Sequence, residues 1–311
     1  MMIVGIVVIV VALMLIVAIP MILPKQRLVL ATTTSTQDSG LLDYIPPDFE
    51  RKYNCIVDVI AVGSGQAMEL GKNGDADVLL VHSPASEIKF VQDGYGTSRT
   101  LVCYNQFVIV GASNDPAGLS LANNATNAFT RIYENGTLGE VVFVSRGDNS
   151  GTHSKEKTIW AKAGLNVSTF SDEWYLSAGQ GMGAVLDMTE QQVNEAQESN
   201  GYTLSDEATY YTRKETGIIP NLDIAFQGDP LLFNQYSVIP VNPDLWPHIN
   251  YTLAQDFVEW ITSGGIQGMI GDFTDAYGHK LFVANAGPGS TIPVDRQTSH
   301  AGGEILAKSE G

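Results

Sequence analysis

Apolar runs alternate along the chain with segments of helical periodicity, and turns rich in glycine, serine or threonine separate them. Four units share the order strand, polar turn, helix, which is typical of α/β proteins. Their strands are predicted at residues 28–31, 56–62, 141–144 and 174–178. The helices that follow are predicted at residues 38–51, 67–72, 152–163 and 184–193. This alternation predicts an α/β fold with mainly parallel sheets and flanking helices.

Two further extended runs, residues 106–111 and 235–241, bracket the middle of the chain. Each is followed by a polar segment that contains Asn-Asp-Pro or Asn-Pro. We interpret these runs as two hinge crossovers between two lobes. The first lobe then comprises residues 28–110 and 238–283, and the second comprises residues 111–237. The cleft between the lobes is the expected binding site.

The two ends of the chain differ from the part between them. Residues 1–23 contain no charged side chain and would span about 34 Å as a helix, enough to cross a bilayer core. We therefore interpret residues 1–24 as an uncleaved N-terminal membrane anchor with the binding domain extracytoplasmic; a cleaved signal peptide is the alternative. Residues 284–311 have few apolar side chains, which predicts a disordered tail.

Composition restricts the classes of function. The 311 residues carry a formal net charge of −17, which argues against nucleic acid as a partner, since its binding needs basic patches. The two cysteines, Cys55 and Cys103, could form a disulfide or remain as two buried thiols. No His/Cys cluster has metal-ligand spacing, and no Gly-x-Ser-x-Gly elbow or Walker motif is present. The sequence therefore predicts no catalytic residue, cofactor or metal cation.

The turn at residues 145–152, Ser-Arg-Gly-Asp-Asn-Ser-Gly-Thr, carries the most informative chemistry. Backbone N–H groups that open a helix lack partners and carry partial positive charge, and Arg146 adds a fork of donors. An ordinary capped turn, with Ser150 as N-cap, is the alternative. Three other donor-rich turns follow predicted strands, at residues 32–36, 63–66 and 179–183. If the four turns face one point, they form a cup for a small, fully ionised anion.

These turns resemble those of the tungstate-binding components of ABC importers. The resemblance covers about residues 28–283 and rests on segments 31–42, 60–67, 71–82, 145–153, 179–183 and 228–234. It implies a two-lobed type II periplasmic-binding fold that captures tungstate, or molybdate, and delivers it to a permease driven by an ATPase. The turn that contains Arg146 is also similar to the Arg-x-Asp-x-Ser-Gly-Thr turn of phosphate-binding proteins.

Carried over by position, the resemblance implies a set of ligand-binding residues from both lobes. They are Thr33, Thr34, Ser35, Ser64, Arg146, Ser150 and Thr152. The expected supporting residues are Gly65, Asp148, Gly151 and Gly181.

The protonation state of the anion distinguishes tungstate and molybdate from phosphate. Tungstate and molybdate carry no proton at neutral pH and only accept hydrogen bonds, whereas partly protonated phosphate tolerates a carboxylate acceptor. We expect Asp148 to pair with Arg146 and fix the guanidinium; if Asp148 instead accepted a ligand proton, phosphate would gain support. A phosphate- or sulfate-binding protein, an enzyme and an anchored anion sensor remain the alternatives.

Overall fold

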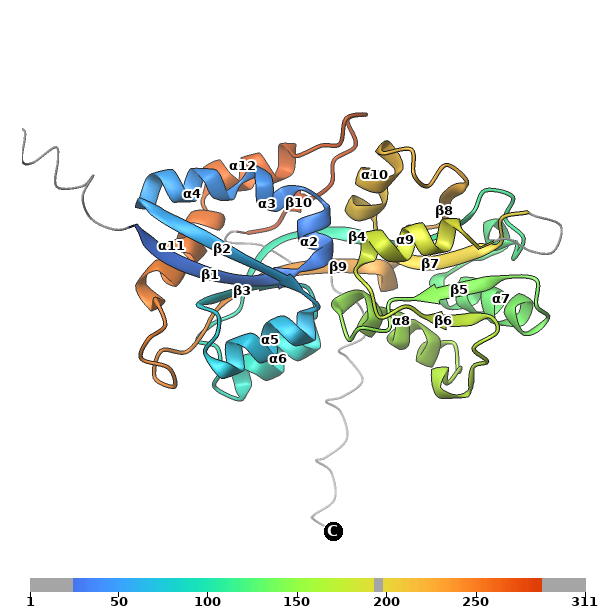
Figure 1. Cartoon of the computed structure of the whole chain (residues 1–311), viewed down its shortest axis with the longest axis horizontal. Helices are drawn as coiled ribbons and strands as arrows, with labels where there is room; N and C mark the ends of the chain where they lie inside the picture. Colours follow the sequence, from blue (N-terminus) through green and yellow to red (C-terminus); the bar gives the residue numbers. More distant parts are fainter. Residues whose placement is uncertain (1–24, 193–197, 287–311) are drawn as a thin grey trace, which may run out of the picture.

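The computed structural model describes residues 25–192 and 198–286 (Figure 1). The predicted anchor at residues 1–24 and residues 287–311 of the predicted tail lie outside the described residues. The tail prediction is wrong for residues 284–286, because Ala284 pairs with Cys103 and the N–H groups of Asn285 and Ala286 donate to Val102 O and Gln267 Oε1. Within the described ranges, no helix combines the length and the apolar character that a membrane span requires.

Ten strands pair in the continuous order β2-β1-β3-β9-β4-β7-β5-β6, and β8 and β10 also pair with β4. Their bounds are β1 (Gln26–Thr33), β2 (Cys55–Val62), β3 (Val78–Val81), β4 (Thr100–Ala112), β5 (Val142–Ser145), β6 (Tyr175–Ser177), β7 (Gly201–Asp206), β8 (Leu222–Phe226), β9 (Phe233–Pro240) and β10 (Val283–Ala284). All four residues of β3 are buried, as expected for a strand covered on both faces.

Strand β4 belongs to both halves of the molecule. Its first part, up to Gln106, pairs with β9, and its second part, from Phe107, pairs with β7. We therefore call residues 25–106 and 233–286 the first lobe, and the described residues between 107 and 232 the second lobe. The predicted divisions after residues 110 and 237 each fall a few residues too late. The change coincides with the start of the continuously buried part of β4 at Phe107, but it falls inside one unbroken strand and no turn marks it.

The strand directions are mixed. Strand β1 pairs in parallel with β2 and β3, and β5 pairs in parallel with β6 and β7, as the alternation of strands and helices predicts. Among the described strands, the pairs that include β4 or β9 are antiparallel. The expectation of mainly parallel sheets therefore holds for the outer strands and fails where the chain crosses between the lobes.

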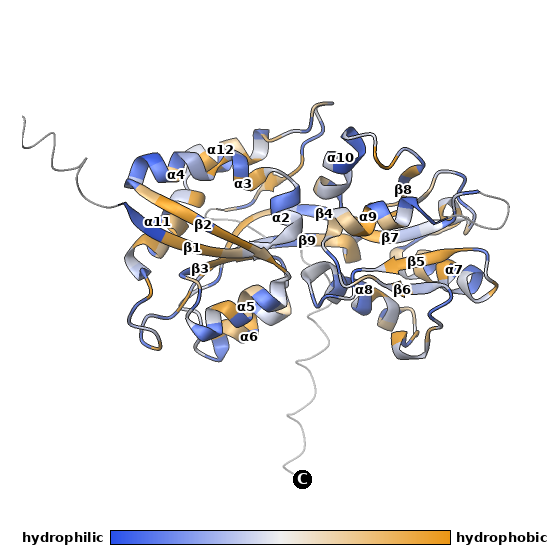
Figure 2. Ribbon diagram, viewed as in Figure 1, coloured by the Kyte–Doolittle hydropathy of each residue, from blue (hydrophilic) through white to orange (hydrophobic). Residues whose placement is uncertain are grey.

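In each lobe, helices cover both faces of the sheet, and four apolar clusters lie between the helices and the strands (Figures 1 and 2). In the first lobe, α4 and α11 pack on one face through Phe49, Phe257 and Trp260, while α5 and α6 pack on the other. The second lobe repeats this plan, with α7 and α8 on one face and α9 and α10 on the other. The helix bounds are α2 (Thr34–Asp38), α3 (Leu41–Tyr44), α4 (Pro46–Tyr53), α5 (Ser64–Asn73), α6 (Pro84–Gln92), α7 (Ala125–Thr137), α8 (Gly151–Lys162), α9 (Met182–Glu190), α10 (Glu207–Glu215), α11 (Tyr251–Ile261) and α12 (Gly264–Asp272).

The helix predicted at residues 38–51 is wrong as a single element. The structure has three short helices there, α2, α3 and α4. Gly40 adopts a φ of 80°, which breaks the helix after α2, and Pro46 starts α4 because its ring is tolerated in a first turn. The early start of α2 carries Thr34 and Ser35 into a helix N-terminus, where their backbone N–H groups have no intrahelical partner.

The two cysteines are free, buried thiols. Of the two interpretations of Cys55 and Cys103, the structure therefore supports the unpaired one.

Candidate functional site

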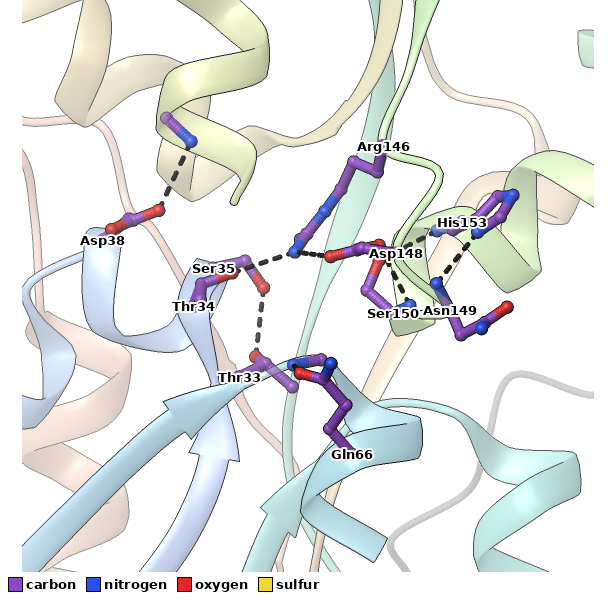
Figure 3. A network of polar contacts seen from close by, with 12 residues as sticks. Thr33, Thr34, Ser35, Asp38, Gln66, Arg146, Asp148, Asn149, Ser150 and His153 are labelled. Carbon is purple, nitrogen blue, oxygen red and sulfur yellow. Dashed lines mark hydrogen bonds and ion pairs between the residues drawn. The ribbon is translucent and has the colours of Figure 1, made fainter. Parts of the chain in front are cut away.

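The four donor-rich turns meet between the lobes, where α2, α5, α8 and α9 begin (Figure 3). The backbones approach closely: a Cβ atom built on Gly63 would lie 3.2 Å from Cα of Ser150 in the opposite lobe. The three predicted supporting glycines lie at the same contact. A Cβ atom on Gly65 would lie 3.1 Å from O of Asn149, one on Gly151 would lie 2.9 Å from O of His82, and one on Gly181 would lie 3.5 Å from Cβ of Thr34.

Arg146 reaches from the second lobe to the first (Figure 3). Its side chain is 1% exposed, and Nη2 donates to Thr34 Oγ1 at 2.9 Å and to Asp148 Oδ2 at 2.5 Å. The predicted pairing of Asp148 with the guanidinium is thus confirmed. Within the described residues, Nε and Nη1 of Arg146 are buried and have no hydrogen-bond partner. Since a buried donor without a partner is costly, these two nitrogens favour a bound acceptor that the described residues do not supply.

Two hydroxyl groups share this property. Ser64 Oγ, in the first turn of α5, and Thr152 Oγ1, in the first turn of α8, are buried without a partner in the described part of the chain. Both belong to the predicted ligand-binding set, and they come from opposite lobes. Hydroxyl and guanidinium hydrogens are donors, so the four unpartnered atoms suit a ligand that accepts hydrogen bonds.

The other predicted hydroxyls are engaged within the protein. Thr33 Oγ1 caps α2 by accepting from Thr36 N at 3.3 Å, and Ser150 Oγ caps α8 by accepting from His153 N at 3.1 Å. Ser35 Oγ lies 3.2 Å from His82 Nε2. The capped-turn interpretation of Ser150 therefore holds alongside the role of its turn at the lobe contact. Thr33 and Ser150 position the helix starts, and their helices offer a ligand backbone N–H groups.

His82 is the residue at the site that sequence reasoning did not single out. It follows β3, is 3% exposed, and its Nδ1 lies 2.9 Å from Asn234 Oδ1. Burial lowers the pKa of His82 to about 4. The available signal was its place directly after a buried apolar run, at the sheet edge where the first two turns also lie.

A buried carboxylate, that of Glu156, anchors the turn that carries Arg146. Glu156 accepts hydrogen bonds from Ser145 Oγ at 2.7 Å, Tyr175 Oη at 2.6 Å and Trp160 Nε1 at 3.2 Å. These bonds tie the end of β5 to α8 and β6. Burial raises the pKa of Glu156 to about 7 despite the three donors.

We expect the protein to be more stable against urea at pH 6 than at pH 8. Burial raises the pKa values of Glu87, Glu156 and Glu207 from 4.5 to about 7, so the folded state binds protons that the unfolded state has lost. Their contribution grows as the pH falls through 7. The lowered pKa of His82 acts in the opposite direction only below about 6.5. Glu156→Gln should reduce the difference between the two pH values; equal or lower wild-type stability at pH 6 would contradict this assignment.

Within residues 25–192 and 198–286, no three His, Cys, Asp or Glu side chains are grouped so that they could hold a metal ion.

The comparisons with known proteins agree with this geometry. Residues 24–264 match the PBP superfamily domain. The chain is 46% identical to the tungstate-binding protein TupA of Peptoclostridium acidaminophilum, over 84% of this chain and 87% of the relative. Among solved structures, the tungstate ABC transporter from Geobacter sulfurreducens is 46% identical, with a TM-score of 0.67 over 79% of this chain and 98% of that chain. The tungstate-binding protein TupA from Desulfovibrio alaskensis G20 is 41% identical, with a TM-score of 0.66 over 84% and 100%.

Proposed function

The chain belongs to the PBP superfamily and, within it, to the family of TupA tungstate-binding proteins, and from this premise we propose that it captures tungstate between its two lobes for an ABC importer. Molybdate, which has the same charge and donor requirements, is the second ligand we propose. The loaded protein would deliver the anion to a membrane permease, and a partner ATPase would drive uptake. We place the binding domain on the extracytoplasmic side.

The observation that carries this proposal is the set of buried donors without a partner in the described residues: Nε and Nη1 of Arg146, Ser64 Oγ and Thr152 Oγ1. A proton-free dianion satisfies such a set, because every contact it makes is as an acceptor. Phosphate would gain from a free carboxylate, but both oxygens of Asp148 already accept hydrogen bonds from the protein. Its Oδ2 accepts from Arg146, and its Oδ1 accepts from Ser150 N at 3.1 Å.

The same geometry supports ligand-driven closure. Ser64 lies in the first lobe, whereas Arg146 and Thr152 lie in the second. An anion can use all three only when the lobes meet, so it binds the closed state more tightly and shifts the population toward it. The permease would then recognise the closed form.

We propose no catalytic step. The relatives compared above are named for binding or transport. His153 is the histidine in the α8 start, and its Nδ1 accepts from Asn149 N at 3.0 Å rather than from a hydroxyl group.

A competition thermal-shift experiment tests the ligand. Tungstate and molybdate should raise the melting temperature by about 5–10 °C at about 100 times the Kd, because a ligand that binds only the folded state adds its binding free energy to stability. Sulfate and phosphate at the same concentration should shift it less. A larger shift with phosphate than with tungstate would overturn the proposed ligand.

A further inference from the structure

A hydrogen-bonded network of four polar side chains lies next to the proposed anion site: Ser35, His82, Asn234 and Tyr236. His82 Nε2 lies 3.2 Å from Ser35 Oγ, and His82 Nδ1 lies 2.9 Å from Asn234 Oδ1. Asn234 Nδ2 donates to the hydroxyl of Tyr236 at 3.2 Å. The Tyr236 ring stacks on the imidazole, with centroids 4.8 Å apart. This network of four side chains joins the start of α2 to β9, one of the strands at the lobe junction.

The directions of these hydrogen bonds follow from Asn234. Its Nδ2 donates to Asn105 Oδ1 at 2.8 Å as well as to Tyr236, so its Oδ1 faces His82 as an acceptor. Nδ1 of His82 must therefore carry a hydrogen. A neutral imidazole has one N–H, which leaves Nε2 as an acceptor for the hydroxyl of Ser35. Ser35 Oγ also lies 3.1 Å from Thr33 Oγ1, which can donate to it. The single hydroxyl hydrogen of Ser35 then points at His82 and is withheld from a ligand.

We propose that His82 is a positioning residue of the oxyanion site, which takes up a proton when the anion binds and thereby turns the Ser35 hydroxyl toward the ligand. In the protonated imidazole both nitrogens donate, Nδ1 to Asn234 and Nε2 to Ser35 Oγ. The hydroxyl hydrogen of Ser35 is then released to the anion. The proton comes from solvent, at most one for each anion bound. This inference rests on the proposed function of the cleft.

The charges that face His82 explain why the ligand would control its protonation. Burial, with the positive charges of Arg146 and Lys155, holds the pKa of the unliganded imidazole low, and Asp148 opposes them. The groups that face it from β4, α2 and β9 are the ring of Phe107 and the side chains of Ser35, Asn234 and Tyr236. A bound dianion adds two negative charges beside Arg146, which favours the protonated imidazole. Because the liganded state then binds more protons, affinity must increase as the pH falls.

Calorimetric titration of the full chain with micromolar sodium tungstate tests this linkage. The titrations are made at pH 8, 7 and 6, in buffers of different ionisation enthalpy. The wild type should show net proton uptake on binding, and its affinity should increase by about threefold or more from pH 8 to pH 6. His82→Gln keeps a polar amide but cannot take up the proton, so its affinity should vary less with pH and its proton uptake should fall. His248→Gln is the control, since that histidine lies 2.9 Å from O of Gly74, at the end of α5 opposite Ser64, and should leave the uptake largely intact.

The outcomes separate this inference from the function it rests on. A wild type that does not bind tungstate would overturn the proposed function and this inference with it. Tungstate binding with the same proton uptake in wild type and His82→Gln would overturn the inference alone.

If His82→Gln does not fold, a second variant tests the same role of His82. Asn234→Asp places a carboxylate against Nδ1, which stabilises the imidazolium and should move the pH dependence of affinity to higher pH. An unchanged pH profile in folded Asn234→Asp would also overturn the role of His82.

Discussion

Replacing Arg146 with alanine is expected to weaken tungstate binding by about 100-fold. The side chain is buried, and two of its nitrogens, Nε and Nη1, have no acceptor within the described residues. A hydrogen bond to a charged group contributes about 1.5–3 kcal/mol, so two of them amount to at least two orders of magnitude in Kd. The variant also leaves Asp148 without its cationic partner, which adds repulsion toward a dianion. Isothermal titration calorimetry measures the loss directly.

Two control variants isolate the contribution of geometry. Arg51→Ala removes the same charge from α4, where the side chain is 79% exposed, and should leave the affinity within about twofold. Arg146→Lys retains the charge but not the fork of donors, so it should recover only part of the affinity. Wild-type affinity in Arg146→Ala would remove the arginine from the site.

Replacing Gly151 with alanine is expected to weaken tungstate binding by about 10- to 100-fold through steric exclusion alone. The new Cβ atom would lie 2.9 Å from both O and Cε1 of His82, which belongs to the opposite lobe. The imidazole has little freedom to move, because both its nitrogens are hydrogen-bonded. Overpacking of this kind costs about 1–3 kcal/mol, and here the cost falls on the closed state.

The unliganded variant can relieve the clash by separating its lobes, so its melting temperature should remain close to that of the wild type. Small-angle scattering should show less compaction on addition of tungstate than in the wild type. Gly268→Ala, in α12, is the control, since a Cβ atom there meets no atom within 4 Å. Full compaction and unchanged affinity in Gly151→Ala would show that the lobe contact is not needed for binding.

Most of the features that could be predicted from the sequence depend on residues that are close together in the chain. Strand ends, the starts of α5, α8 and α9 and the pairing of Asp148 with Arg146 depend on neighbours within a few residues, and the structure has them within three residues of where they were expected. The bond from Arg146 to Thr34 joins residues 112 positions apart, and only packing of the two lobes brings them together. The same holds for His82 and Asn234, which are 152 positions apart.

The hydroxyl groups show a second limit to what can be predicted from the sequence. Ser35 and Ser64 occupy equivalent places after strands β1 and β2, and sequence reasoning gave both the same role. In the structure, Ser35 contacts His82 while Ser64 Oγ has no partner among the described residues. The direction of a hydroxyl hydrogen depends on which acceptor lies nearest in space, and no spacing in the chain encodes that.

The position at which β4 changes partners has a consequence for how specificity could be exchanged. Gln106, the last residue before the change, is the direct cross-strand partner of Phe233, the first residue of β9. The second lobe is therefore an insertion whose two ends leave the host sheet from adjacent points. A graft of the whole insertion from a related protein would have matching attachment points and would carry Arg146 and Thr152 together. Chimeras joined at this pair of residues would thus separate what each half of the cleft contributes to the choice of anion.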